Sequence, residues 1–285
     1  MLRKMIALRT TISQEWHNIT GRPFNNPNQI YAEPIGICDK GTLRHCALLQ
    51  EKTPAPTFIL KCSLPPGFTL PCDISDESCI NKFANILLPH LFTGIQDLEI
   101  PSVDPLYIDK VIGDISILKY TFYNSTIVGF KKCKVSNLKL DKEFTKLSYD
   151  LICPHLIMTG IYDITGRLVL LPVEGNGDFK MTSGKYFIHV ESELKTTKGK
   201  TDKIHAHIKN FKLKCEPQEP LYFDFKNLFN GQKDLSDTVH KFANENWQEV
   251  ANQVQDPLFY AIMKRIVTIS NKYLKHVPLE DILRM

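Results

Sequence analysis

The sequence lacks the short motifs that mark common catalytic and nucleotide-binding sites. GxSxG, GxGxxG, P-loop and HExxH patterns are all absent from its 285 residues. Gly175 and Gly177, in VEGNGDF, lie between strand-like segments and not before a helix, which argues against a phosphate-binding loop there. The sequence shows no recognisable pair of a catalytic nucleophile and a general base. We therefore predict that the protein is not an enzyme and that it uses no cofactor.

Clusters of metal ligands are also missing. The eight cysteines form no CxxC pair and the histidines form no HxxxH pair, so a structural zinc site is not expected. His205 and His207 share one face of a predicted strand, but a metal ion there would need a third ligand from elsewhere. Asp73, Asp76 and Glu77 lack the spacing of an EF-hand loop. We interpret all five as solvated polar residues and predict no metal site.

Neither a concentrated charge nor a long apolar run is present. The net charge is +4, and lysine and arginine are scattered among aspartate and glutamate, which gives no support for nucleic-acid binding. The locally basic stretch 195–203 (KTTKGKTDK) is predicted to be a hairpin tip with Gly199 at its turn. No run approaches the ~18 apolar residues of a membrane span, so we expect no stable insertion into a membrane.

The first 60 residues carry no sustained hydrophobic period and are rich in Asn, Pro, Thr and charged residues. We expect residues 1–60 to be a poorly ordered extension or a non-native leader, whose deletion leaves the melting temperature nearly unchanged. The start, MLRKMIALRT, is basic, but its apolar stretch from Met5 to Leu8 is too short for the core of a signal peptide.

The C-terminal region changes from a strand pattern to a helical one. Leu221, Phe223 and Phe225 alternate with polar residues, and from Leu235 onward apolar residues recur at helical spacing. A single helix over 235–276 would be about 60 Å long. A compact domain of the remaining size would be only ~45 Å across. Either the fold is elongated or the helix breaks, and Asp256-Pro257 is the predicted break or kink.

The middle of the chain indicates a meander of antiparallel hairpins that follows one amphipathic helix starting at Ser78. The turns carry glycine, and the alternation of strand and helix that a parallel sheet requires is absent. The apolar stripe of the last helix needs a partner surface as long as itself, so we predict an α+β fold in which a long, curved antiparallel sheet wraps this helix. The predicted strands are 122–130, 156–164, 168–171, 179–181, 186–190, 204–213 and 221–225.

Two cysteines are spaced for a disulfide. Cys72 and Cys79 flank an acidic loop (CDISDESC), and the six residues between them let the chain fold back and bring the sulfurs together. All eight cysteines could instead be reduced in the cytosol. We favour a Cys72–Cys79 bridge in an oxidising compartment.

Several segments together resemble the insect takeout and juvenile-hormone-binding protein family. They are PCDISDESCINKFANILLPHLFTGIQDLEIPSVDPL (71–106), TGIYDITGRLVLLPVEGNGDFKM (159–181), YFDFKNLFNGQKDLSDTVHKFANENWQEV (222–250) and VPLEDIL (277–283). The resemblance covers about residues 62–285 and implies a lipid-binding domain over 61–285. It also implies a tubular superroll, in which a strongly curved antiparallel sheet wraps a long helix and encloses an apolar tunnel. The family's N-terminal bridge maps onto Cys72 and Cys79.

The function that this resemblance implies is that of a secreted carrier. Its partner would be one small lipophilic ligand, a long-chain lipid or a juvenile-hormone-like terpenoid, and we expect the carrier to be a monomer. The alternative is an interaction protein with a filled core that acts through a surface contact with a receptor. An enzyme acting on a lipid ester has the least support. The ligand-binding residues are expected on or beside the inward stripe of the C-terminal helix: Phe242, Val250, Val254, Phe259, Ile262 and Ile266.

The positions of the remaining cysteines indicate which branch of the family the chain resembles. The resemblance places a second bridge, reaching into the C-terminal helix, in the hormone carriers proper. No cysteine follows Cys215 here, which favours the takeout-like branch. Cys133, Cys153 and Cys215 are then unexplained, and buried free thiols are the simplest interpretation of them.

Overall fold

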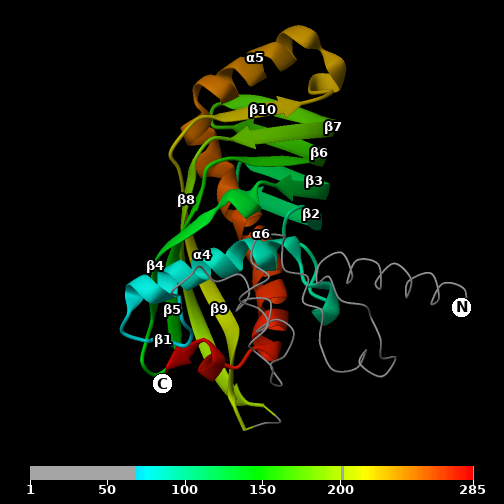
Figure 1. Ribbon diagram of the computed structural model, residues 1–285. Helices are drawn as coiled ribbons and strands as arrows, with labels where there is room; N and C mark the ends of the chain where they lie inside the picture. Colours follow the sequence, from blue (N-terminus) through cyan, green and yellow to red (C-terminus); the bar gives the residue numbers. More distant parts are fainter. Residues whose placement is uncertain (1–67, 200–201, 285) are drawn as a thin grey trace, which may run out of the picture. The chain divides into compact units, whose positions relative to one another are not determined.

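The computed structural model describes residues 68–199 and 202–284. The expected N-terminal extension, its boundary near residue 61, and Cys38, Cys46 and Cys62 lie outside the described residues. Within the described ranges the chain forms three α-helices and two larger antiparallel sheets (Figure 1).

The five-stranded sheet has the order β10-β7-β6-β3-β2 and is antiparallel throughout. Alternate residues of its long strands are buried, as Met158, Tyr162 and Ile164 are in β6, so one face of the sheet points into the core. Its strands are β2 (Leu106–Ile115), β3 (Leu118–Val128), β6 (Leu156–Leu168), β7 (Leu171–Ser183) and β10 (Leu221–Phe225).

The four-stranded sheet has the order β4-β5-β8-β9 and is also antiparallel. A short parallel pair, β1 (Cys72–Asp73) with β11 (Leu283–Arg284), joins the two ends of the described chain. The strands of the four-stranded sheet are β4 (Lys134–Leu140), β5 (Lys146–Cys153), β8 (Tyr186–Lys198) and β9 (Ile204–Pro217).

The three helices are α4 (Glu77–Thr93), α5 (Lys233–Glu245) and α6 (Trp247–His276). With 30 residues, α6 is about 45 Å long. Of the predicted break or kink at Asp256-Pro257, the break is wrong, because the chain leaves helical geometry at Asn246 (φ −108°, ψ 34°) and Pro257 lies inside α6; a kink stays a prediction. None of the described helices is both long and apolar enough to cross a membrane.

Packing explains why α6 continues through its proline. Pro257 has no backbone N–H to donate, which weakens the helix locally. Val250 and Ala251 before it and Leu258 after it are all buried, so the same core holds the helix on both sides of the proline. The Tyr120 hydroxyl on β3 also donates to the backbone oxygen of Val254 over 2.6 Å, which fixes the turn just before the proline.

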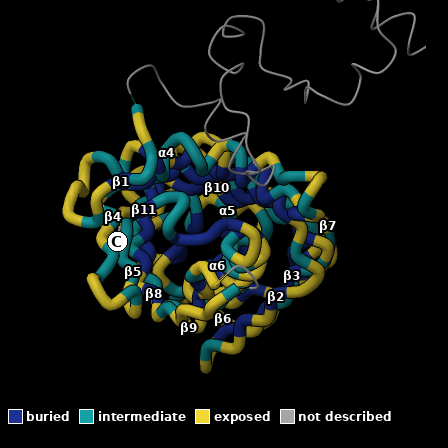
Figure 2. Tube along the Cα trace, turned by 60° about the horizontal axis from the view of Figure 1, so that its bottom comes forward, coloured by how far each residue is buried: buried dark blue, intermediate teal, exposed yellow. Residues whose placement is uncertain are grey.

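The predicted fold class is confirmed. The long helix α6 runs along antiparallel sheets and contacts β2, β9 and β10, and the sheet is not closed. In Figure 2 the buried residues gather on the inside, around α6. Two predictions need correction: β2, β4 and β5 were not among the predicted strands, and 168–171 is the hairpin turn that ends β6 at Leu168 and begins β7 at Leu171.

Asparagine side chains connect the helices to three edge strands. Asn85 on α4 donates to the Val135 oxygen of β4 (2.7 Å) and accepts from its N–H (3.0 Å). Asn271 on α6 makes the same pair of bonds with Ile208 of β9, and Asn244 on α5 does so with β10. Each amide therefore satisfies backbone groups that a further strand would otherwise pair, which protects the exposed edge.

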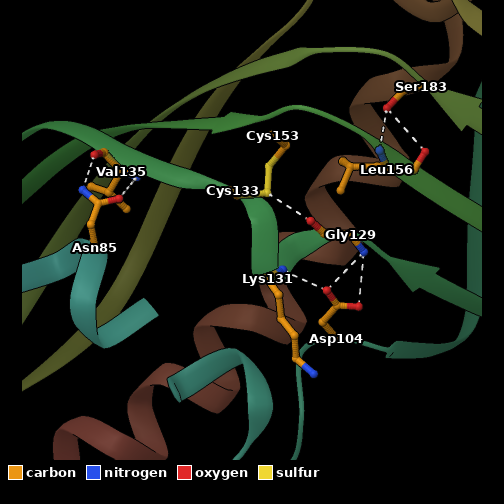
Figure 3. Close-up of a disulfide and its surroundings, with 9 residues drawn as sticks. All are labelled: Asn85, Asp104, Gly129, Lys131, Cys133, Val135, Cys153, Leu156 and Ser183. Carbon is orange, nitrogen blue, oxygen red and sulfur yellow. Dashed lines mark hydrogen bonds between the residues drawn. A yellow bond between two sulfur atoms is a disulfide. The ribbon is translucent and has the colours of Figure 1, made fainter. Parts of the chain in front are cut away.

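The disulfides confirm one prediction and overturn another. Cys72 and Cys79 are bridged, as expected, with an S–S distance of 1.99 Å. The simplest interpretation of Cys133 and Cys153, as buried free thiols, is wrong, because they form a second bridge (Figure 3). Pairing of β4 with β5 brings the two together, with their Cα atoms 4.1 Å apart. Cys215 is buried and free, as predicted.

Candidate functional site

An apolar seam lies between the inner face of the five-stranded sheet and the helices α5 and α6. We call it the interior seam; it contains two cavities. The first has a volume of about 40 Å³ and lies against β3, β6, β7, β10, α5 and α6. The second, of about 60 Å³, lies against β3, β6, β7, β8, β10 and α6. Aliphatic and aromatic side chains make up most of both linings, together with His240 in the first cavity and Thr182, Ser183 and Gln255 in the second.

Three side chains separate the two cavities. Met181, Phe223 and Val254 line both of them, so they form the shared wall. These volumes count the space open to the centre of a water-sized sphere, of which one water molecule needs roughly 10–15 Å³. Each cavity therefore holds only a few water molecules. Two small cavities with a shared wall are thus seen among the described residues, and a continuous tunnel remains a prediction.

Four of the six predicted ligand-binding residues reach these cavities. Val250 lines the first, Val254 lines both, and Phe259 and Ile262 line the second. The other two do not: Ile266 is buried in the core and Phe242 is partly buried against it. Four residues of the helical stripe thus lie in one wall of the seam, and their role in ligand binding stays a prediction.

The opposite wall comes from the sheet, and analysis of the helix stripe did not identify it. A signal was present, because these strands alternate apolar and polar residues. Alternation alone does not say which strands lie against the helix. The sheet residues that line the seam include Phe122, Ile164, Val173, Met181, Phe223 and Phe225.

The polar groups that line the first cavity are hydrogen-bonded to other groups of the protein. The Tyr120 hydroxyl donates to the Val254 oxygen, and burial raises the pKa of Tyr120 far above its usual value, so the phenol stays neutral. His240 on α5 lies with Nε2 2.9 Å from the Phe225 N–H and Nδ1 2.8 Å from the Ser236 oxygen. An acceptor at Nε2 and a donor at Nδ1 correspond to the neutral imidazole.

Tyr186, Gln255 and Ser183 bring polar groups to the second cavity, and these groups too are hydrogen-bonded within the protein. The Tyr186 hydroxyl donates to Gln255 Oε1 (2.9 Å), and Gln255 Nε2 donates to the Cys215 oxygen (3.1 Å). Ser183 Oγ accepts the Leu156 N–H at 3.2 Å (Figure 3). Burial raises the pKa of the Cys215 thiol to about 12, with a smaller contribution from Asp256, so the thiol is uncharged.

Helix α5 covers the first cavity. Its Val239 and Ala243 are buried and form part of the cavity wall. His240 and Asn244 attach the same helix to β10 through the Phe225 and Phe223 backbones. The described residues contain no cluster of three His, Cys, Asp or Glu side chains placed to hold a metal ion. The arrangement is suited to holding apolar matter away from water.

Fold and seam together define the class of this protein: a long helix packed along open antiparallel sheets, with an apolar interior. Residues 47–284 match the family described as haemolymph juvenile hormone binding protein, and the chain belongs to this family. The resemblance noted in the sequence is therefore confirmed.

Individual relatives agree with this assignment. The crystal structure of Takeout 1 from Epiphyas postvittana superposes with a TM-score of 0.72 at 27% identity, over 76% of this chain and 100% of that one. The circadian clock-controlled protein daywake of Drosophila melanogaster is 24% identical over 229 residues, which are 75% of this chain and 88% of the relative. The daywake protein of Drosophila yakuba is 22% identical over the same shares of the two chains.

Proposed function

We propose that this protein is an extracellular carrier that binds one small lipophilic ligand in the interior seam. The observation that carries the proposal is the lining: apolar side chains form both cavities, and the polar groups named above are already hydrogen-bonded within the protein. Membership in a family named for binding juvenile hormone in haemolymph supports the same function. The ligand class is a long-chain lipid or a terpenoid.

Burial of apolar surface would supply most of the affinity. At ~25 cal/mol per Å², a ligand that buries about 400 Å² gains roughly 10 kcal/mol before the entropy costs of association. Micromolar binding corresponds to about 8 kcal/mol, so it follows if those costs stay below about 2 kcal/mol or the ligand buries a larger area. No catalytic step is part of this proposal.

The ligand must widen the seam to enter. The wall between the cavities contains Met181, whose unbranched side chain adopts other rotamers more readily than Phe223 or Val254. A shift of Met181 would connect the two cavities along α6. Movement of α5, which covers the first cavity, would give further room.

Two disulfides support the extracellular location. Cys72–Cys79 and Cys133–Cys153 both join segments of the described domain. Such bridges persist in oxidising compartments and are rare in the cytosol. The haemolymph named in the family description is such a compartment.

The second candidate function is an interaction protein with a filled core. Cavity volumes of only about 40 and 60 Å³ favour it, because neither accommodates a long chain without rearrangement. Such a protein would act through its surface and would need no ligand inside.

Val254→Trp separates the two candidates, because Val254 lines both cavities. In a carrier whose seam widens, the indole occupies the ligand's space, so a fluorescent fatty acid should bind at least tenfold more weakly while stability changes by less than about 1 kcal/mol. In a filled core the larger side chain costs about 1–3 kcal/mol. Thermal unfolding and binding are measured on the same delipidated sample.

The matched control is Glu249→Trp, which adds the same ring at an exposed position of α6. It should change neither stability nor binding. Native mass spectrometry of the untreated protein should also show a co-purified lipid. Lost stability in Val254→Trp together with unchanged binding would reject the carrier.

A further inference from the structure

The outer face of the five-stranded sheet, which points away from the interior seam, carries exposed apolar side chains. Tyr107 on β2 is 64% exposed, Ile112 on the same strand 60%, and Ile161 on β6 44%. The strands β2, β3 and β6 lie next to each other (Figure 1), and Tyr123 on β3 pairs with Ile161. We call these four side chains the outer patch. An apolar surface of this kind on a secreted protein calls for something that covers it.

A bulge in β3 lies beside this patch, and Asn124 forms it. The register between β3 and β6 shifts between Tyr123 and Thr126, so that Asn124 and Ser125 together stand opposite Gly160. The backbone φ of Asn124 is 46°, in the left-handed region that asparagine adopts more readily than most residues. Asn124 belongs to no residue pair with β2 or β6, and it is exposed. Its side chain is therefore accessible in the middle of a sheet.

Asn124 also begins the sequence Asn-Ser-Thr (124–126), which is an acceptor pattern for N-linked glycosylation. The bulge accounts for an asparagine at this position, but it does not require a hydroxyl side chain two residues later. A glycan is bulky, so the folded protein must leave its attachment point open to solvent, and the exposed bulge does so. The sequence holds one other such pattern, Asn18-Ile19-Thr20, which lies outside the described residues.

The outer patch is within reach of a glycan attached at this bulge. Tyr123 directly precedes Asn124, and Tyr107 pairs with Thr126, two residues after it. At ~3.3 Å per residue along a strand and ~4.8 Å between strands, the Cα atoms of Tyr107 and Asn124 are roughly 8 Å apart. Sugar rings present C–H groups, which pack against aromatic faces and remove apolar surface from water.

We infer that Asn124 carries an N-linked glycan whose first sugars cover the outer patch. In the transfer, the Asn124 Nδ2 atom bonds to C1 of the N-acetylglucosamine of an oligosaccharide donor linked to a lipid diphosphate. The C1–O bond to the diphosphate breaks, the lipid diphosphate leaves with the electron pair, and the amide nitrogen gives one proton to the transferase. The inference rests on the extracellular location in the proposed function, because this donor acts in the secretory pathway.

The test expresses the full chain in insect cells behind a foreign secretion leader. Glycopeptide mapping with peptide N-glycosidase should find Asn124 occupied. Asn124→Gly, which suits the positive φ, and Thr126→Val, which keeps the asparagine, should each remove the mass of one glycan, whereas Thr126→Ser should keep it at lower occupancy. Asn176→Gln is the control and should change no glycan mass, because Asn176 is an exposed asparagine of the same sheet outside any acceptor pattern.

Hydroxyl-radical footprinting before and after enzymatic removal of the glycan tests the cover. Tyr107 and Tyr222 are matched probes, since they are 64% and 61% exposed, but Tyr222 lies on β10, three strands away from β3. Removal should raise the labelling of Tyr107 at least twofold and leave that of Tyr222 unchanged. An unchanged Tyr107, or an equal rise at both tyrosines, would overturn the cover.

Secreted protein whose Asn124 peptide carries no glycan overturns the inference. Because the foreign leader brings every chain into the secretory pathway, that result is independent of where the natural protein is located. The carrier function is tested separately, by Val254→Trp in protein made in bacteria without glycosylation. An occupied Asn124 in a protein that binds no lipid would support the glycan site and reject the carrier.

Discussion

The two sheets share the helix α6 but close around it differently. On the five-stranded sheet, α5 covers the end of the seam, the cavities are small, and the polar groups named in their lining are paired within the protein. On the four-stranded sheet, the space between β9 and α6 is open, with a volume of about 1010 Å³. Similar strand patterns therefore yield a closed interior or an open groove, depending on which helix lies over them.

The two halves also differ in what holds them together. The five-stranded half has an aromatic cluster, in which Phe179 lies 4.6 Å from Phe122 and 5.5 Å from Phe225 between ring centroids. The four-stranded half has a disulfide between Cys133 and Cys153 at the open end of its first hairpin, beyond the pair Lys134–Ile152 and away from the turn. A more open half thus relies on a covalent link where the closed half relies on packing.

Removing that disulfide should have the largest effect. Cys133→Ser with Cys153→Ser should lower the free energy of unfolding by roughly 3 kcal/mol, because the bridge closes a 20-residue separation. The Cys72–Cys79 bridge closes a separation of only 7, so its double serine variant should lose roughly 2 kcal/mol. Urea denaturation at fixed pH measures both. An equal or reversed order would show that the four-stranded half does not depend on its bridge.

A buried carboxylate on the other face of the same sheet should have the next largest effect. Asp150 is 6% exposed, accepts from Asn137 at 2.6 Å, and lies 2.6 Å from His189 Nδ1. Burial alone would raise the pKa of Asp150, but the hydrogen bonds with His189 and Asn137 outweigh it and the pKa is lowered. Asp150→Asn should therefore cost about 1–2 kcal/mol at neutral pH.

The sign of the pH dependence follows from the lowered pKa. A depressed carboxyl pKa stabilises the folded state above the unfolded value, near 3.8, and this contribution is lost as pH falls through the folded value. The stability gap between wild type and Asp150→Asn should be full at pH 5–7 and shrink below about pH 4. Asp163→Asn, at an exposed position of β6, is the control and should show no gap. A gap that is independent of pH would exclude the ionised carboxylate as its cause.

The smallest effect should come from loosening the cover of the closed half. Asn244→Ala removes the two hydrogen bonds by which α5 holds β10 at Phe223, and should cost about 1 kcal/mol. The change should appear as faster amide hydrogen exchange in α5 and β10, and as faster entry of a fluorescent fatty acid. Lys241→Ala, at an exposed position of the same helix, should leave both rates unchanged. Unchanged exchange in Asn244→Ala would mean that packing alone holds α5 in place.

Local pattern and spacing were sufficient for several features of this protein. The helical spacing after Leu235 predicted the long C-terminal helix, and glycine-containing turns between alternating segments predicted antiparallel hairpins. The short separation of Cys72 and Cys79 predicted their bridge. Four of the six residues predicted to bind the ligand line the cavities of the seam, because a helical stripe depends on spacing alone: Val250, Val254, Phe259 and Ile262.

Only the tertiary structure decided the rest, because those features depend on contacts between distant segments. The helix continues through Pro257 and breaks at Asn246, since burial on both sides of the proline outweighs its local effect. Cys133 and Cys153 meet because β4 pairs with β5, which a separation of 20 residues does not reveal. The side chains of Leu147, Ser192 and Phe211, finally, share one face beside the open space between β9 and α6 because of the strand register, and no sequence pattern specifies that register.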